Sequence, residues 1–168
     1  MIFETPRLCL RRVTKEDIKE LFSQIFSNKE VVKYTFGHNL FSFDEAKTFI
    51  ENNCNFNGIF GLSVIEEKRS SKVIGLAGIV RCNYLDCEDY EIGFILGKTF
   101  WGKGYATEIG EGQIEFAKDK LKANRVLALA HKDNVGSLNC IKKLGFKYCK
   151  TISTSDGRGD REVFYINL

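Results

Sequence analysis

The chain has 168 residues, of which 43% are hydrophobic and 28% are charged, a composition typical of a folded globular protein. This composition excludes a disordered or collagen-like chain, and no run approaches the roughly 20 apolar residues of a membrane helix. We expect one domain over residues 1–168, because a chain of this length buries about 70% of its unfolded surface. The amino-terminal segment lacks the basic-then-apolar pattern of a leader, so the sequence predicts a cytoplasmic protein outside the membrane.

Positive charge is concentrated in one part of the chain. The formal net charge is +3, but residues 98–150 hold 11 basic and 5 acidic side chains, whereas residues 1–97 hold 12 and 14. A local excess of this size favours an anionic small ligand. It is smaller than the continuous basic surface that nucleic-acid-binding proteins usually carry, so we expect no nucleic-acid partner.

The six cysteines are scattered along the chain. Only Cys82 and Cys87 lie close together in sequence, and no histidine is near them. Free thiols in a reducing compartment explain this pattern better than a disulfide framework or a zinc site. We therefore expect reduced cysteines and no metal.

Local patterns predict the elements of the first half of the chain. Apolar and polar residues alternate over 8–13, which predicts a strand. Thr14 and Asp17 form a capping-box pattern before a helix with an apolar stripe. Ser42 and Glu45 repeat that pattern before a second helix. Apolar, partly β-branched runs then predict strands at 59–66, 73–81 and 90–96.

The second half alternates between helices and strands. A glycine-rich turn precedes a predicted helix over 105–121, and a short buried strand follows at 125–130. The next helix starts at Asn134 and ends before Gly145. Two final strands are expected at 147–153 and 162–167. The order of these elements predicts a mixed α+β domain with helices on both faces of its sheet.

The most informative segment is FILGKTFWGKGYATE at 94–108, a glycine-rich turn between a strand and a helix. The N–H groups at a helix N-terminus point into one space and carry about half a positive charge, so they bind phosphate or pyrophosphate. Glycines let such a ligand approach the backbone. GKGYAT alone differs from the dinucleotide-binding pattern G-x-G-x-x-G at one position, because Thr107 replaces the third glycine. A nucleotide-dependent oxidoreductase and a turn without a ligand both remain open.

A second segment, DNVGSLNCIKKLGF at 133–146, follows the short strand at 125–130. Two strands that end side by side, each followed by a helix, leave a wedge between their ends. An extended ligand could enter this wedge with its phosphates on the first helix, and Asn134 and Ser137 would then face it. For Asn134, a plain helix cap is the alternative, and the residue type alone favours it.

Together these segments resemble the GNAT superfamily of acyl-CoA-dependent N-acyltransferases, and within it the RimJ/RimL-type branch. The likeness is carried by TPRLCLRRVTKEDIKELF at 5–22, EIGFILGKTFWGKGYATE at 91–108 and DNVGSLNCIKKLGF at 133–146. The resemblance implies a GNAT fold, with a mixed, largely antiparallel sheet of about seven strands splayed between two parallel strands. It also implies an acetyltransferase that uses acetyl-CoA and an amine acceptor.

The resemblance assigns most of the acetyl-CoA site to the glycine-rich turn. The family pattern there is Q/R-x-x-G-x-G/A, and Thr99 departs from it at the first position. Backbone amides would hold the pyrophosphate at Trp101, Gly102, Lys103, Gly104, Tyr105, Ala106 and Thr107. A half-strand would pair its backbone with the pantetheine arm at Phe94, Ile95 and Leu96. Asn134 matches the family residue that contacts this arm, and Ser137 matches a position near the thioester sulfur.

Direct attack on the thioester in a ternary complex needs a neutral amine. An α-amine, with a pKa of about 7.7–8.0, is partly neutral at pH 7, whereas a lysine amine, at about 10.4, is not. Glu91, on the strand that leads into the loop, is the candidate base through a water, and a solvated strand carboxylate is the alternative. Ser137 would protonate or hydrogen-bond the departing thiolate. A non-catalytic acyl-CoA-binding module is the competing function.

The sequence leaves several acceptors open. Tyr34, Phe36 and His38 are candidates to line an acceptor pocket, although a plain loop also explains the histidine. We expect Trp101 to pack beside the loop rather than stack on adenine, and His131 to be a packing or rim residue. Protein N-termini, polyamines, amino acids and aminoglycoside-like drugs all fit a fold of this kind. Pairing into a homodimer is also left open.

Overall fold

The computed structural model describes residues 1–37, 40–154 and 159–168. Its strands are β1 (Phe3–Glu4), β2 (Leu8–Arg11), β3 (Gly61–Glu67), β4 (Lys72–Cys82), β5 (Asp89–Leu96), β6 (Arg125–Ala130), β7 (Lys147–Ser153) and β8 (Asp160–Asn167). They form one eight-stranded sheet in the order β1-β2-β3-β4-β5-β6-β8-β7, and β5 and β6 pair in parallel while the other neighbours are antiparallel. The predicted mixed, largely antiparallel sheet is confirmed, and the extra strand is the two-residue β1.

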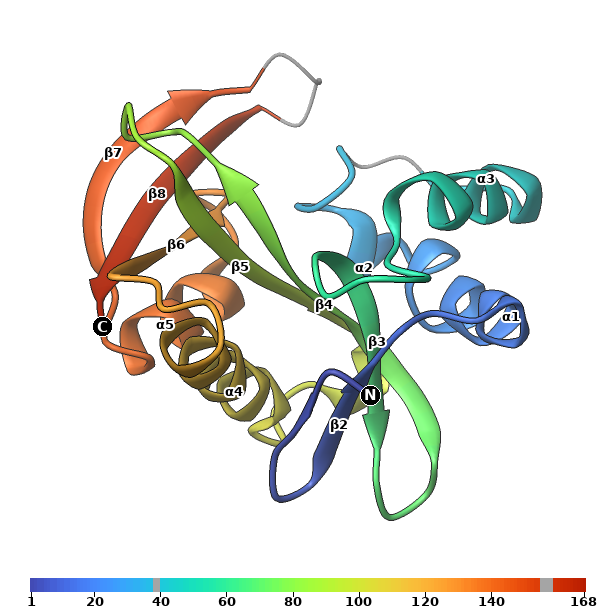
Figure 1. Ribbon diagram of the computed structural model, residues 1–168. Helices are drawn as coiled ribbons and strands as arrows, with labels where there is room; N and C mark the ends of the chain where they lie inside the picture. The colour runs from blue at the N-terminus through green and yellow to red at the C-terminus, as the bar shows by residue number, and fades with distance from the viewer. Residues whose placement is uncertain (38–39, 155–158) are drawn as a thin grey trace.

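Helices cover both faces of the sheet (Figure 1). The α-helices are α1 (Ile18–Leu21), α2 (Lys29–Val32), α3 (Phe43–Asn53), α4 (Tyr105–Asp119) and α5 (Val135–Lys143). Shorter turns are η1 (Lys15–Asp17) and η3 (Lys98–Phe100), which are 3₁₀, and η2 (Phe22–Phe26), which is a π-helix. The α1–α3 group lies on one face and α4 with α5 on the other. Within the described ranges, no helix has the length and apolar character needed to cross a bilayer.

The caps that the sequence predicts fix where the helices begin and end. At the start of α3, Ser42 and Glu45 exchange the two hydrogen bonds of a capping box. At the start of α5, Asn134 Oδ1 accepts the backbone N–H of Ser137 at 3.2 Å. Gly145 ends that helix in the left-handed region, with φ of +85°. The Asn134 cap thus fixes the α5 N-terminus, whose residues line the cleft described below.

Close packing explains the two glycines inside α4. A Cβ built on Gly110 would lie 2.5 Å from Leu144 Cδ1, and one on Gly112 would lie 2.6 Å from Phe3 Cε2. Both distances are shorter than side chains tolerate, so glycine lets α4 approach the chain around α5 and β1. This close approach offsets the roughly 1 kcal/mol that a glycine costs inside a helix.

The parallel strands β5 and β6 diverge after a short pairing. In the described residues, β5 pairs with β6 at Tyr90 and Glu91. On its other side β5 stays paired with β4 as far as Leu96. At the start of the pair, the Arg125 guanidinium donates to both carboxylate oxygens of Asp89 at 2.7 Å. The two strands are therefore tied together at one end and open toward the other, which produces the predicted wedge.

The Asp89–Arg125 pair should stabilise the fold measurably. Hydrogen bonds from Arg125 lower the pKa of the buried Asp89 carboxyl. Its stabilisation is therefore present above the ordinary aspartate pKa and is lost as the pH falls through the lowered pKa. We expect Asp89→Asn to reduce the free energy of unfolding at pH 7 by about 1.5–3 kcal/mol, measured by urea denaturation. The deficit should shrink in acid.

Glu88→Gln is the matched control for this prediction. Glu88 lies one position earlier and pairs with Arg81 across 3.7 Å, with both side chains exposed. An exposed pair of this kind contributes at most about 1 kcal/mol. Equal losses in the two variants would contradict a special role for the Asp89 pair.

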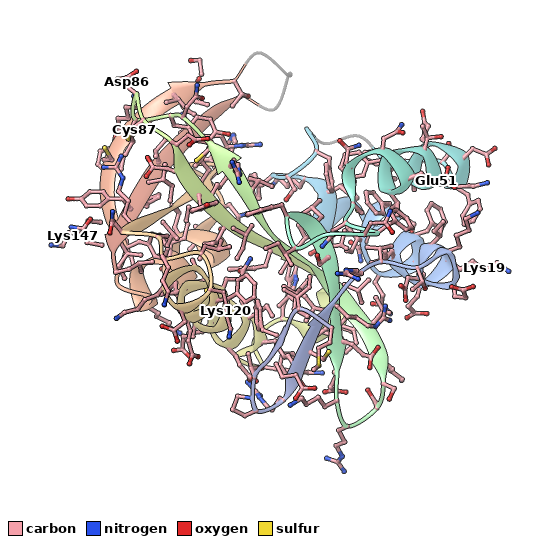
Figure 2. The ribbon with its side chains drawn as sticks, in the orientation of Figure 1. Lys19, Glu51, Asp86, Cys87, Lys120 and Lys147 are labelled. Atoms are coloured by element: carbon pink, nitrogen blue, oxygen red, sulfur yellow. The ribbon has the colours of Figure 1, made fainter. Side chains whose placement is uncertain are left out.

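All six cysteines are free thiols. Cys82 ends β4, and Cys87 lies with Asp86 at the tip of the hairpin between β4 and β5 (Figure 2). Burial, together with the nearby Glu91 and Asp89 carboxylates, raises the pKa of the Cys82 thiol to about 12, so this thiol stays protonated at neutral pH. Nowhere in the described part of the chain do three or more His, Cys, Asp or Glu side chains gather as metal ligands would.

Candidate active site

A cleft of about 520 Å³ lies where the end of β5, the N-termini of α4 and α5, and the α2 region meet. This volume is within the range of about 300–1,000 Å³ that small-molecule sites occupy. Segments far apart in the sequence line the cleft, namely residues 30–31, 33–35, 94–96, 100–102, 104–106 and 133–137. The cleft thus joins the two motifs that sequence analysis placed on one ligand.

Most of the predicted cofactor residues line this cleft. They are Phe94, Ile95, Leu96, Trp101, Gly102, Gly104, Tyr105, Ala106, Asn134 and Ser137. Lys103 and Thr107 belong to the same segment, but their side chains have other neighbours. Lys103 Nζ lies 5.3 Å from the centre of the Phe100 ring, and Thr107 Oγ1 lies 3.7 Å from Cys140 Sγ. These two residues can offer the cleft their backbone N–H groups rather than their side chains.

The loop before α4 has the backbone geometry of an anion site. Gly102 and Gly104 have φ of +73° and +80°, and Gly104 is the N-cap of α4 without a side-chain cap. The N–H of Glu108 is bonded to Gly104 O at 3.1 Å, and the preceding N–H groups lie before the first intrahelical bond. The amide of Trp101 differs, because it donates to Lys98 O at 3.2 Å. The amides that this geometry offers to a phosphate therefore begin at Gly102.

An arginine that sequence analysis missed fixes this loop from outside the cleft. Arg7 Nη1 donates to Lys103 O at 2.9 Å, and Arg7 Nε lies 2.5 Å from Glu108 Oε2. The guanidinium also lies 4.5 Å from the centre of the Tyr105 ring. The Arg7 side chain thereby contacts the loop at Lys103 and the first turn of α4 at Tyr105 and Glu108. The sequence contains one indication that Arg7 has a role at the site, because Arg7 lies in the segment 5–22 that carries part of the family resemblance.

The edge of β5 is open along the cleft. Beyond Glu91, no described strand pairs with β5 on its β6 side. Leu96 O accepts the indole N–H of Trp101 at 2.8 Å, so this carbonyl is already occupied. Gly97 N–H donates to Ile74 O on β4, and backbone groups alternate in direction along a strand, so those of Ile95 also face β4. The backbone groups of Phe94 and the N–H of Leu96 are the part of the edge that an extended ligand can use. The Trp101 ring itself is 45% exposed at the rim of the loop.

Glu91 lies where β5 and β6 part, next to the cleft rather than in its lining. It stands opposite Val80 on β4 and Leu127 on β6, and its side chain is half-buried. Side chains alternate along a strand, so Glu91 shares a face with Ile95, which packs in the core under α1–α3. The Glu91 carboxylate therefore faces the α1–α3 side of the sheet.

The three predicted acceptor residues have different positions. Tyr34 lines the cleft, and its ring stacks on His131 with centres 5.2 Å apart. Its carbonyl accepts a hydrogen bond from the buried Arg161 at 2.8 Å, which ties the α2 region to β8. Phe36 instead packs its ring into the aromatic core under α1–α3. His38 lies outside the described residues.

An ion pair joins α2 to the loop, and sequence analysis did not anticipate it. Glu30 Oε1 lies 2.5 Å from Lys98 Nζ, and Glu30 lines the cleft. The two residues are 68 positions apart in the sequence. The pair links α2 to the segment that follows β5, and Glu30 contributes to the wall of the cleft.

Comparison with known proteins identifies the family. Residues 7–147 match the family model described as the acetyltransferase (GNAT) domain. The chain belongs to the GNAT acetyltransferase family. This GNAT protein is 31% identical over 147 residues to the uncharacterized N-acetyltransferase p20 of Bacillus licheniformis. The matched region covers 85% of this chain and 80% of that protein. It is thus an acetyltransferase, and the oxidoreductase alternative is removed.

Solved structures agree with the GNAT fold. A GNAT-family acetyltransferase from Bacillus anthracis has a TM-score of 0.82 at 20% identity, covering 99% of this chain and 98% of that one. A spermidine N-acetyltransferase from Vibrio cholerae, solved with CoA and spermine, has a TM-score of 0.73 at 20% identity, covering 96% and 95%. At these identities the likeness concerns the fold.

Proposed function

We propose that this GNAT protein transfers an acetyl group from acetyl-CoA to a primary amine by direct attack within a ternary complex. The proposal rests on one juxtaposition: the left-handed glycines at the N-terminus of α4 lie beside the open edge of β5. The first feature suits a pyrophosphate and the second suits an extended amide-bearing arm. CoA carries these two groups in sequence, and the spermidine acetyltransferase structure contains CoA.

Each group of residues then has a defined task. Acetyl-CoA supplies an activated acetyl thioester when bound. The N–H groups from Gly102 to Thr107 bind its pyrophosphate, and the backbone of Phe94 with the N–H of Leu96 binds its arm. Glu91 accepts the proton that the amine loses, through a water, and Ser137 donates a hydrogen bond to the thiolate that leaves. Asn134, besides capping α5, lies in the cleft lining within the same turn as Ser137.

The wider assignment follows the motifs. We place the protein in the RimJ/RimL-type branch on its three sequence blocks, as a single cytoplasmic domain over residues 1–168. The acceptor is a primary amine, either a peptide N-terminus or a small molecule. The spermidine acetyltransferase structure, which contains spermine, supports an amine acceptor on this fold.

A binding and turnover experiment tests the proposal. Acetyl-CoA at 100 times its dissociation constant should stabilise the protein by about 2.7 kcal/mol, seen as a raised melting temperature, whereas NAD should have no effect. Free thiol should then be released with at least one of spermidine, kanamycin and tripeptides that begin with glycine, alanine or valine. Binding of acetyl-CoA without thiol release from any of these amines would favour the non-catalytic binding module.

Ser137→Ala separates catalysis from binding. The backbone N–H of residue 137 caps α5 through Asn134, and alanine keeps that hydrogen bond, so the fold should be unaffected. We expect the turnover rate to fall about 100-fold, the scale of general acid catalysis, while acetyl-CoA affinity changes only a few-fold. Asn139→Ala, at an exposed position of the same helix, should leave both unchanged. An unaltered rate in Ser137→Ala would remove this residue from the mechanism.

A further inference from the structure

Gly93 lies in the middle of β5, and within the described part of the chain no packing contact explains the absence of a side chain there. A Cβ built on it meets no atom within 4 Å in the described part of the chain. Its β4 partner Gly78 differs, because a Cβ there would lie 2.7 Å from Gly61 O. Gly93 is also absent from the residues with left-handed φ, so its backbone conformation does not require glycine.

The open space above Gly93 has a definite position. Because side chains alternate along a strand, residue 93 faces the same side as Glu91 and Ile95. Ile95 packs into the core under α1–α3, and Glu91 carries the carboxylate to which we assign the proton transfer. The space is therefore flanked by a candidate base on one side and by an apolar side chain that lines the cleft on the other.

The backbone beneath this space is held firmly from the opposite face. Gln113 of α4 is fully buried, and its Nε2 donates to Gly78 O at 2.6 Å and to Gly93 O at 3.1 Å. Both acceptors are carbonyl oxygens, which fixes the orientation of the amide. This bridge holds β4 and β5 together below Gly93, so the space keeps its shape and position relative to Glu91.

We propose that Gly93 is a specificity-determining residue that makes room for the acceptor. The carbon that bears the reacting amine lies over Gly93, between Glu91 and Ile95, so the enzyme takes primary amines with little bulk at that carbon. The Glu91 carboxylate favours the approach of a cationic amine from the α1–α3 side. This assignment rests on the proposed acetyl transfer and adds the size selection that the same site imposes.

Gly93→Ala and Gly93→Val test the proposal, because the added Cβ meets no atom within 4 Å in the described part of the chain and valine is favoured in strands. Melting temperature and circular dichroism should match those of the wild type. In Gly93→Ala the KM for the best amine of the panel should rise at least about fivefold, and more for alanine- and valine-starting peptides than for glycine-starting ones. Gly93→Val should lose turnover while its acetyl-CoA dissociation constant stays within about twofold.

Gly58→Ala is the matched control, because a Cβ there meets Asn55 Oδ1 at an ordinary 3.6 Å and its φ is not left-handed. It should leave the KM for the amine unchanged. Unchanged amine KM values in the Gly93 variants of an active enzyme would overturn the inference alone. A weakened acetyl-CoA dissociation constant with an unchanged amine KM would also overturn it. Absence of turnover by the wild type with every amine would overturn the proposed function, and this inference with it.

Discussion

Gly104→Val should abolish acetyl-CoA binding, with a dissociation constant raised at least about 100-fold. Gly104 has φ of +80° and ψ of 1°, a conformation that costs a side-chain-bearing residue roughly 1–2 kcal/mol. A Cβ at this position would also lie 3.3 Å from Arg7 Nη2, so valine pushes against the side chain that fixes the loop. Whether the loop keeps its conformation or leaves it, the amides before α4 lose their common direction. Isothermal titration with acetyl-CoA measures the loss.

Gly159→Val is the control for backbone strain alone. Gly159 has a similar φ of +75°, and a Cβ there meets no atom within 4 Å in the described ranges. This variant should lose comparable folding stability and keep its acetyl-CoA affinity. Gly104→Ala, without the branched side chain, should fall between the two. A folded Gly104→Val protein that binds acetyl-CoA normally would show that the phosphates bind elsewhere.

Local sequence signals were sufficient to predict most elements and the two segments that meet in the cleft. The strands at 125–130 and 147–153 were predicted with their observed bounds, because alternation or an apolar run is visible within one element. The capping box of Thr14 and Asp17 was also predicted and is present. The glycine-rich turn was recognised because glycine spacing encodes backbone conformation directly, and Gly102 and Gly104 adopt the left-handed φ that glycine permits.

The elements that sequence analysis missed are too short to show a period. The two-residue β1 and the four-residue α2 each contain less than one informative repeat. The π-helix η2 follows α1 directly and continues its apolar stripe, so periodicity does not distinguish it from an α-helix. The insertion of β8 between β6 and β7 is a matter of long-range pairing, which no local pattern records.

Long-range contacts at the site were also invisible to pattern analysis. Arg7 and Glu108 are 101 positions apart, and Arg161 and Tyr34 are 127 positions apart. Each pair is set by how the sheet folds, and an arginine or a glutamate alone gives no sign of its partner. The vacant space at Gly93 is the same kind of feature, because a glycine in a strand indicates a close approach, a bulge or an open site equally well. Only the coordinates of its neighbours decide among these.

Glu91→Gln should lower the reaction rate by an amount that depends on the acceptor and on pH. Glutamine keeps the size of the side chain and the pairing of β5 with β4 and β6, but it cannot accept the proton. For a lysine-like amine, the neutral fraction at pH 7 is about 1 in 2,500, so kcat should fall by about 100-fold or more. For an α-amine, roughly one molecule in ten is already neutral, and a several-fold loss is expected.

The pH profile of Glu91→Gln distinguishes proton transfer from positioning. The deficit should shrink as the pH rises toward the pKa of the free amine, because the amine then loses its proton in bulk water. Steady-state kinetics from pH 6.5 to about 9.5, with Glu88→Gln as the control on the same hairpin, give the comparison. A loss that is constant across this range would mean that Glu91 orients the acceptor. An unaltered rate at every pH would mean that solvent and backbone carbonyls carry the proton away, and that the carboxylate beside Gly93 serves only the shape of the site.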